Sequence, residues 1–405
     1  MLKLANIVFE DLRKELLFCE SSCDWIARYD FVLISPHGGM NHFIDEFEKV
    51  KNINEFDKKT LYIISSYAEG HLEEETLKQI HDKFNKSKIP LENVLLVQSN
   101  YNLKKQYDNF CSNNKIKNKI NILITEHKLE SCVESFLQLH NGEWDLSGDT
   151  FPKEPSINMW EDVENVSNRD YHFLSYNKTL RPDRVALLSM MYKNDLISKG
   201  LVSIGSKDYG SIGKQPWPND FDFIVDNLDD VKKWSQKLQK LQPLSVDGEP
   251  EIDKLDEGKY KNLNVCGYTY GDQFRRVYYM VVTEDVFNSD SMFFSQTTYK
   301  PIVSLTPFIM FGSPHMMRNL REEQGFKTFS PWIDESYDDE EDHEKRLFMI
   351  IEEVKRLCNM KKTDMDEWYS EMKDILIHNQ NHLLNYKIQD YDKIYEFVKK
   401  KYLLK

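Results

Sequence analysis

Four polar side chains lie between a short apolar segment and the start of a segment with helix-forming composition. Together they have the chemistry of an anion-binding site. The apolar segment is Tyr171–Ser175, and the four residues are Asn177, Lys178, Arg181 and Arg184. A guanidinium group binds two phosphate oxygens at once, and a helix N-terminus attracts negative charge. The pattern predicts a site for a phosphate or diphosphate. The alternative is that the two arginines, which flank Pro182, only pair with surface carboxylates.

A second polar group follows the apolar segment 277–282. It consists of Glu284 at the end of that segment and, after a loop, Ser295, Thr298 and Lys300. A carboxylate accepts hydrogen bonds from both hydroxyls of a ribose, while hydroxyls and an ammonium bind a diphosphate. The carboxyl ends of parallel strands share one edge of a sheet, so we expect Lys178, Arg181 and Lys300 to converge there. The alternatives are a helix-capping role for Ser295 and a surface position for Lys300.

A third group is the turn Ser-Pro-His-Gly-Gly at residues 35–39, after the first apolar segment. Glycines allow a close approach to a ligand, and His37 titrates near neutral pH. His37 is therefore the candidate general base that takes a proton from a hydroxyl. Asp45 and Glu126 are the reserve candidates for the same role.

Several functional classes lack their fingerprints in this sequence. It contains no G-x-G-x-x-G, no G-x-x-x-x-G-K-[ST] and no G-x-S-x-G. These motifs accompany dinucleotide-binding oxidoreductases, P-loop nucleotide hydrolases and α/β-hydrolases.

Alternating strands and helices must position these groups. In the first part of the chain, strand patterns occur at 31–34, 61–64, 94–97 and 122–124, and a helical pattern at 71–86. In the second part, strand patterns occur at 171–175, 201–204, 277–282, 307–311 and 326–329. Helical patterns of the second part occur at 185–192, 231–241 and 316–323. Such alternation predicts an α/β fold with two doubly wound, Rossmann-like domains built on parallel sheets. We place the domains at 1–150 and 167–335, joined by a polar connection at 144–165. Residues 336–405 form C-terminal helices after an acidic segment, 335–344, that is typical of a solvated helix start.

Length, net charge and cysteine content limit the kinds of protein that this sequence can encode. With 405 residues, two cores are expected, and a net charge of −14 disfavours a protein that holds nucleic acid through its overall field. The six cysteines are too sparse for a disulfide framework and lack zinc-like spacing. No apolar segment is long enough to span a membrane, and charges interrupt the N-terminus too early for a secretory signal. We therefore expect a cytoplasmic protein without a membrane span.

Two islands of sequence carry a resemblance. The segments FFSQTTYKPI, PFIMFG, GFKTF and WIDESYD, together with the earlier YHFLSYNKTLRPDRVALL, resemble a group of virus- and bacterium-encoded glycosyltransferases. Their layout is similar to the nucleotide-sugar half of GT-B enzymes such as the fucosyltransferase and exostosin-like families. One departure is Gln296, which follows Ser295 where the resembled pattern has an acidic residue.

The resemblance implies a viral or phage glycosyltransferase with two domains facing a cleft. The second domain would bind the nucleotide-sugar donor and the first the acceptor, which would be a glycan, a protein or a modified DNA base. The C-terminal helices would return to the first domain, and cations of the protein would hold the diphosphate without an obligatory divalent metal. Because of Gln296, the alternative is a catalytically inactive α/β protein that binds nucleotides or serves in assembly.

Asp220 and Asp222 offer one rival site. The sequence Asp-Phe-Asp is similar to the D-x-D motif with which GT-A transferases hold a metal ion and a diphosphate. Two carboxylates on one side of an extended segment can share a divalent ion. Here they lie in a proline-containing loop, which favours a structural role.

Overall fold

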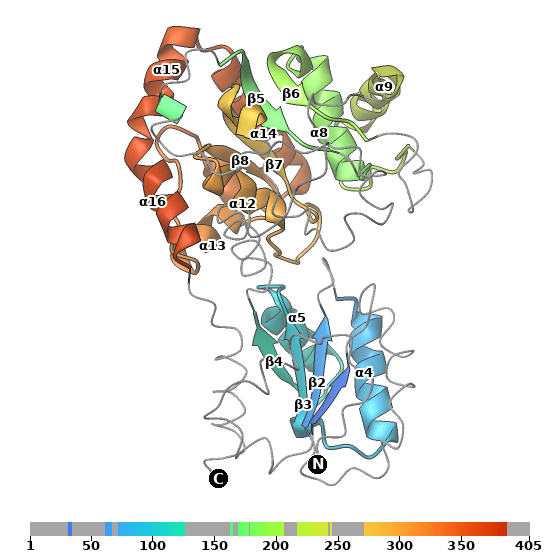
Figure 1. The fold of residues 1–405 in the computed structure, drawn as a ribbon. Helices are drawn as coiled ribbons and strands as arrows, with labels where there is room; N and C mark the ends of the chain where they lie inside the picture. Colours follow the sequence, from blue (N-terminus) through green and yellow to red (C-terminus); the bar gives the residue numbers. More distant parts are fainter. Residues whose placement is uncertain are drawn as a thin grey trace, which may run out of the picture. The chain divides into compact units, whose positions relative to one another are not determined.

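A computed structural model describes residues 31–34, 61–66, 72–125, 163–164, 169–177, 179–205, 217–241, 244 and 271–386. These residues belong to two compact units (Figure 1). The first unit holds the described residues up to 125 and the segment Ser289–Phe293, and the second holds the rest. Each unit has a sheet in which all strand pairs are parallel, so the predicted α/β class is confirmed.

The first unit is built on a four-stranded sheet. Its strands are β1 (Phe31–Ile34), β2 (Leu61–Ser66), β3 (Val94–Gln98) and β4 (Asn121–Ile124), and they lie side by side in that order. All four coincide with predicted apolar segments. Helix α4 (Glu74–Lys86) and the 3-10 turn η3 (Leu91–Asn93) connect β2 to β3, and helix α5 (Leu103–Asn113) connects β3 to β4.

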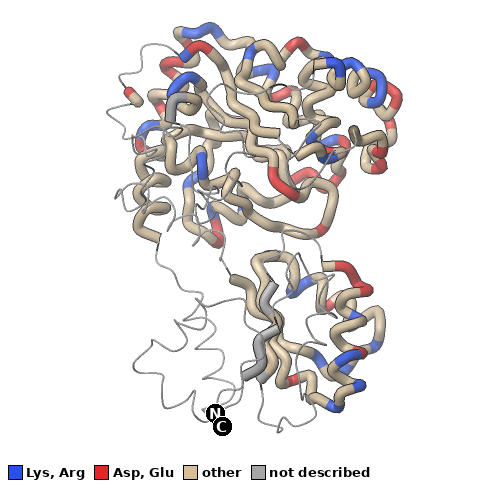
Figure 2. The backbone as a smooth tube through the Cα atoms, turned by 45° about the vertical axis from the view of Figure 1, so that its right-hand side comes forward, with Lys and Arg blue, Asp and Glu red and all other residues tan. Residues whose placement is uncertain are grey.

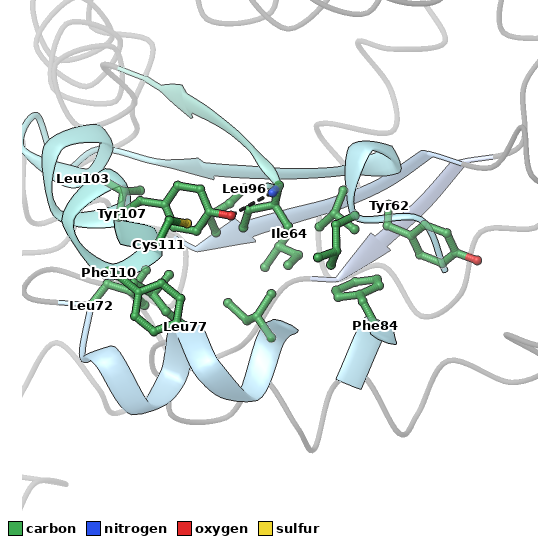
Figure 3. Close-up of a cluster of buried hydrophobic side chains, with 14 of the residues drawn as sticks. Tyr62, Ile64, Leu72, Leu77, Phe84, Leu96, Leu103, Tyr107, Phe110 and Cys111 are labelled. Atoms are coloured by element: carbon green, nitrogen blue, oxygen red, sulfur yellow. Dashed lines mark hydrogen bonds between the residues drawn. The ribbon is translucent and has the colours of Figure 1, made fainter. Parts of the chain in front are cut away.

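Alternate strand residues and the inner sides of α4 and α5 form the core of this unit (Figure 3). Ile64 and Leu96 are paired across β2 and β3, and both are fully buried with Phe84 of α4. One polar group is enclosed among these apolar side chains. The Tyr107 hydroxyl accepts a hydrogen bond from the backbone N–H of Ile120 at 2.8 Å and lies 2.9 Å from Nε2 of His81. Burial raises the pKa of Tyr107 and lowers that of His81, so the pair is neutral.

The second unit has a four-stranded parallel sheet with a different strand order. Its strands are β5 (Tyr171–Ser175), β6 (Gly200–Val202), β7 (Val277–Thr283) and β8 (Phe308–Phe311), in the spatial order β6-β5-β7-β8. The chain first extends the sheet from β5 to β6 on one side. It then returns to the other side of β5 for β7 and β8. The neighbouring strands β5 and β7 therefore flank a topological switch point, where open α/β sheets bind ligands.

Helices connect and surround these strands (Figure 1). They are α8 (Pro182–Lys193), α9 (Leu228–Leu238), α11 (Gly271–Arg275), α12 (Gln296–Val303), α13 (Met316–Glu322), α14 (His343–Cys358), α15 (Lys362–Glu371) and α16 (Lys373–Leu384), with 3-10 turns η4 (Ile197–Lys199), η6 (Gln239–Leu241) and η8 (Ser336–Asp339). Helix α14 packs on β8 and α8, α15 on β7, and α16 on α12. Through Tyr386, the C-terminal helices thus belong to the second unit.

Charge is distributed as the parallel sheet requires. Strands β5 to β8 contain no Lys, Arg, Asp or Glu, and the charged residues of this unit lie on helices and loops (Figure 2). Both faces of a parallel sheet are covered, so a charge in a strand would be buried without water. No helix among the described residues is long and apolar enough to cross a membrane.

The prediction of a strand at 326–329 was wrong. Gly325 ends the preceding turn with φ +80°, as a helix-terminating glycine does, and the N–H of Phe326 returns to the carbonyl of Leu320 at 2.9 Å. The next backbone groups bond to side chains. Lys327 exchanges two hydrogen bonds with the Asn379 side chain, and the N–H of Phe329 donates to Glu335. The segment satisfies its backbone without a strand partner, which an apolar pattern does not reveal.

The enclosed hydroxyl of the first unit leads to a stability prediction. Tyr107→Phe leaves the buried N–H of Ile120 without its acceptor, and an unsatisfied buried donor costs about 1–3 kcal/mol. Urea unfolding of the full chain should show this loss in the transition of the first unit. Ser112→Ala, on the same helix, removes an exposed hydroxyl and should change stability by less than about 0.5 kcal/mol. Equal effects of the two substitutions would contradict the assigned role of Tyr107.

Candidate functional site

The loops after β5 and β7 meet at the carboxyl edge of the second sheet. Leu174 of β5 pairs with Met280 of β7, so the ends of these strands are neighbours. The hydroxyl of Thr283 donates to the carbonyl of Tyr176 at 3.0 Å, which joins the two ends beyond the last strand pair. The two polar groups predicted from sequence therefore open from adjacent strands at the switch point.

Two arginines from the β5–α8 loop converge on one acid that follows β7. Arg184 is buried, and its Nη2 lies 2.9 Å from the carbonyl of Thr283 and 2.9 Å from Oδ1 of Asp285. Arg181 places Nη2 2.8 Å from the same Oδ1, and its Nη1 donates to the Asp285 carbonyl. Both arginines thus pair with a carboxylate, the alternative stated for them above, although that carboxylate is half-buried at the switch point. The Arg181 side chain keeps 34% of its surface exposed, against 8% for Arg184.

Glu284 holds the start of helix α12. Its carboxylate accepts the N–H of Ser295 at 3.0 and 3.1 Å and the hydroxyl of Thr298, and all three residues are buried. Ser295 is the N-cap of α12, since its Oγ accepts the N–H of Thr297 at 3.1 Å. The polar atoms of Glu284, Ser295 and Thr298 bond to one another and to the α12 backbone, and the capping alternative for Ser295 holds. Their contacts with a ribose and a diphosphate stay a prediction.

Burial raises the pKa of Glu284 to about 7, and the neighbouring charge of Asp285 adds to that rise. The hydrogen bonds from Thr298 and Ser295 act in the opposite direction, because they favour the charged carboxylate. The net effect is a carboxyl group that changes its charge near neutral pH in the folded protein.

Asn177 has an unused acceptor at the same edge. Its N–H donates to Oγ of Ser203 and its Nδ2 to Oγ of Ser175, both at 2.9 Å. Its Oδ1 is buried and has no hydrogen-bond partner among the described residues. Asp183, in the first turn of α8, likewise has one carboxylate oxygen without a partner there, and burial raises its pKa. Unmatched buried acceptors are costly, and a donor from an ordered water or a ligand would satisfy them.

Some predicted residues remain outside this geometry. Lys178, His37, Asp45 and Glu126 lie outside the described residues. Lys300 is partly exposed in α12, the helix that follows β7. Asp222 lies 3.5 Å from the Asn288 amide, and no metal-binding group among the described residues includes it.

Sequence reasoning missed Asp285, although it directly follows Glu284 at the end of an apolar segment. Its position at the carboxyl end of a predicted strand could have identified it as a site residue. A hollow of about 1080 Å³ along α14, lined by described residues, contains none of the predicted site residues. The candidate site therefore rests on the polar groups of the sheet edge.

The acidic segment 335–344 is more than a solvated helix start. Asp338 is buried, and its two oxygens accept the N–H groups of Met317 and Arg318, both at 2.9 Å. Glu344 accepts the N–H groups of three consecutive residues, 225–227, at 2.7–2.9 Å. These two carboxylates therefore anchor backbone from other parts of the unit.

Comparison of the chain with protein-family models, with curated proteins and with solved structures finds no match.

The buried carboxyl of Glu284 predicts a pH-dependent stability. Its pKa rises from the ordinary 4.5 to about 7 on folding, so the folded state retains the proton more strongly. The resulting stabilisation is complete below about pH 4.5 and is lost as pH rises through about 7. At 1.36 kcal/mol per pKa unit, the free energy of unfolding of the wild type relative to Glu284→Gln should fall by about 2–3 kcal/mol between pH 5 and 8. Urea unfolding at four pH values measures it.

The control is Glu322→Gln, which removes an exposed carboxylate at the end of α13. Its difference from the wild type should vary little over the same pH range. A Glu284→Gln difference that stays constant with pH would show that this carboxyl does not titrate there.

Proposed function

We propose that the chain is a glycosyltransferase and that the switch point of its second unit binds the diphosphate of a nucleotide-sugar donor. The observation that carries the proposal is the partly exposed side chain of Arg181 at the carboxyl edge, beside the ends of β5 and β7. Ligands of open α/β sheets bind at such an edge. A guanidinium there suits an anion with paired oxygens. The resemblance of the segments around Arg181 and Lys300 to glycosyltransferases supports the same assignment.

In the reaction, a hydroxyl oxygen of the acceptor forms a bond to the anomeric carbon of the sugar. The bond from that carbon to the diphosphate oxygen breaks, and the nucleoside diphosphate leaves with the bonding electrons. Negative charge grows on the leaving oxygens, so a preorganised cation lowers the barrier. We assign this role to Arg181, aided by Lys178 and Lys300. Asn177 and Asp183 would accept hydrogen bonds from the nucleotide sugar through the oxygens that have no partner among the described residues.

The proposal extends to the domain roles of a GT-B enzyme. The first unit would hold the acceptor, which is a glycan, a protein or a modified DNA base. A general base from that unit would take the proton of the attacking hydroxyl, with His37 as the first candidate and Asp45 and Glu126 in reserve. Glu284 would act indirectly, because its carboxylate holds the first turn of α12 and with it the helix that carries Lys300.

A second candidate function is binding without catalysis, as in a nucleotide-binding or assembly protein. The favouring observation is that Asp285 already neutralises both arginines at the switch point. A site whose cations are paired internally has less positive charge to offer a leaving group. Turnover separates the two candidates, because only a transferase releases nucleoside diphosphate when donor and acceptor are both supplied.

The donor site predicts a selective loss of affinity. Arg181→Ala should weaken nucleoside diphosphate binding by about 1.5–3 kcal/mol, the size of a hydrogen bond to a charged group, and should leave the free nucleoside almost unaffected. Calorimetry with UDP, GDP, ADP and TDP, each beside its nucleoside, measures both quantities. The wild type should also gain melting temperature with the preferred diphosphate.

Arg276→Ala is the matched control. Arg276 directly precedes β7 at the opposite edge of the same sheet, and its side chain is about as exposed as that of Arg181. The two variants therefore lose the same charge, but only Arg181→Ala loses it at the switch point. Its diphosphate affinity should stay at the wild-type value. Absence of binding by the wild type, or equal losses in the two variants, would remove the switch point as the donor site.

The proton-accepting role of His37 predicts a different pattern. His37→Ala should reduce turnover by roughly 10²–10⁴-fold, the usual contribution of a general base, with little change in donor affinity. Release of nucleoside diphosphate in the presence of acceptor, followed in time, gives the turnover. Full activity in the variant would pass the role to Asp45 or Glu126, and no turnover by the wild type with any acceptor class would favour the binding protein.

A further inference from the structure

His315 is held in an unusual backbone conformation on the loop after β8. Its φ is +67°, in the left-handed region that residues other than glycine rarely adopt. The N–H of His315 donates to the carbonyl of Asp338 at 2.7 Å, which fixes this conformation. A rare backbone conformation costs free energy and persists where the surrounding structure requires it. Here it brings an imidazole beside the acidic turn η8.

The bonds of the imidazole determine which ring nitrogen has a free lone pair. Nε2 lies 2.8 Å from Oε1 of Glu341, and an ionised carboxylate only accepts hydrogen bonds, so Nε2 carries the hydrogen. In the neutral ring, Nδ1 is then an acceptor. Nδ1 is inaccessible to solvent and has no hydrogen-bond partner among the described residues. Oδ1 of Asp339, which accepts a hydrogen bond from Nη2 of Arg318, lies 3.4 Å away. Two lone pairs therefore stand close together, an arrangement that a cation between them would stabilise.

Asp338 supplies a third oxygen in a fixed position. Its two oxygens accept the backbone N–H groups of Met317 and Arg318, and each oxygen retains a second lone pair. Ligand atoms of His315, Asp338 and Asp339 all lie within 4.8 Å of one another. Two ligands of a tetrahedral zinc ion with bonds of about 2.0–2.1 Å stand about 3.3–3.5 Å apart. The separation of 3.4 Å between Nδ1 and Asp339 matches that geometry.

Charge favours a cation at this position. The imidazole is surrounded by the carboxylates of Asp338, Asp339 and Glu341, and Arg318 is the cation bonded to Asp339. With a neutral imidazole, the three carboxylates and Arg318 sum to about −2, and Arg346, which interacts electrostatically with Asp338 and Glu341, reduces this to about −1. The remaining negative charge attracts a cation.

We propose that His315, Asp338 and Asp339 bind a divalent metal ion of the zinc class through Nδ1 and two carboxylate oxygens. Glu341 is the outer carboxylate that orients the imidazole, as metal-bound histidines commonly require. Water completes the coordination, since three protein ligands leave a fourth position open. A hollow of about 430 Å³ is lined by two of the proposed ligands, Asp338 and Asp339, and by Arg318. This proposal does not depend on glycosyl transfer.

The rival explanation is a doubly protonated imidazole that donates to Glu341 and to Asp339. In that case a proton on Nδ1, in place of a metal ion, lies between Nδ1 and the Asp339 carboxylate. The two explanations differ in whether the protein takes up a metal and in whether His315 controls that uptake.

The test uses the untagged full chain and follows the binding of Zn²⁺ by calorimetry and of Co²⁺ by visible absorption. The expected result is a site that gives Co²⁺ the intense bands of tetrahedral coordination. His315→Gln and Asp339→Asn should each weaken it at least tenfold. Asp339 is exposed, so its variant keeps the backbone bonds of Asp338 and tests the site without a risk to folding.

Two controls match these variants. His378→Gln removes a histidine on α16, and Glu322→Gln removes an exposed acid on α13, and neither should change metal affinity. Metal affinity that is the same in His315→Gln and in the wild type would overturn the proposal, because binding would then belong to other residues. A chain that binds no Zn²⁺, with His315 doubly protonated at pH 7 by nitrogen NMR, would establish the imidazolium instead.

Discussion

The buried guanidinium of Arg184 is the interaction on which the edge of the second sheet depends. It comes from α8, after β5, and bonds to the Thr283 carbonyl and to the Asp285 carboxylate, after β7. A buried charge is costly unless it is paired and hydrogen-bonded, so these acceptors must stay in place. The requirement ties two loops that are about a hundred residues apart in the chain. Arg181 shares Asp285 and is thereby held at the switch point with part of its surface exposed.

Carboxylates that accept backbone N–H groups from distant segments recur throughout this unit. Glu284 holds the start of α12, Asp338 the start of α13, and Glu344 the residues that lead into α9. Helix starts leave N–H groups without partners, and a carboxylate both bonds to them and complements the helix dipole. The acidity of the chain is thus partly structural. At α9 and α13 the N-cap residue makes no side-chain capping bond and a carboxylate from elsewhere in the chain takes that role, whereas α12 also has Ser295 as its N-cap.

The proposed donor site and the proposed metal site both lie where charged side chains also hold the backbone in place. Strands β5, β7 and β8 are neighbours, and Arg181, Glu284 and His315 all follow the carboxyl ends of these strands. Arg184 and Glu284 are enclosed. Arg181 is also paired with Asp285 but keeps part of its side chain exposed, and Nδ1 of His315 has no hydrogen-bond partner among the described residues.

The sequence by itself determined the strands of both sheets, because a parallel strand covered on both faces is a continuous apolar segment, and that signal is local. Segments such as 94–97 and 171–175 were identified to within a residue. Only the tertiary structure decided that β5 lies beside β7, that Asp285 receives both arginines and that Glu284 serves α12. It also left 326–329 without a strand partner, since Asn379 satisfies that backbone from more than fifty residues away. The physical reason is that these outcomes depend on contacts between segments far apart in the chain, whereas composition and periodicity describe each segment alone.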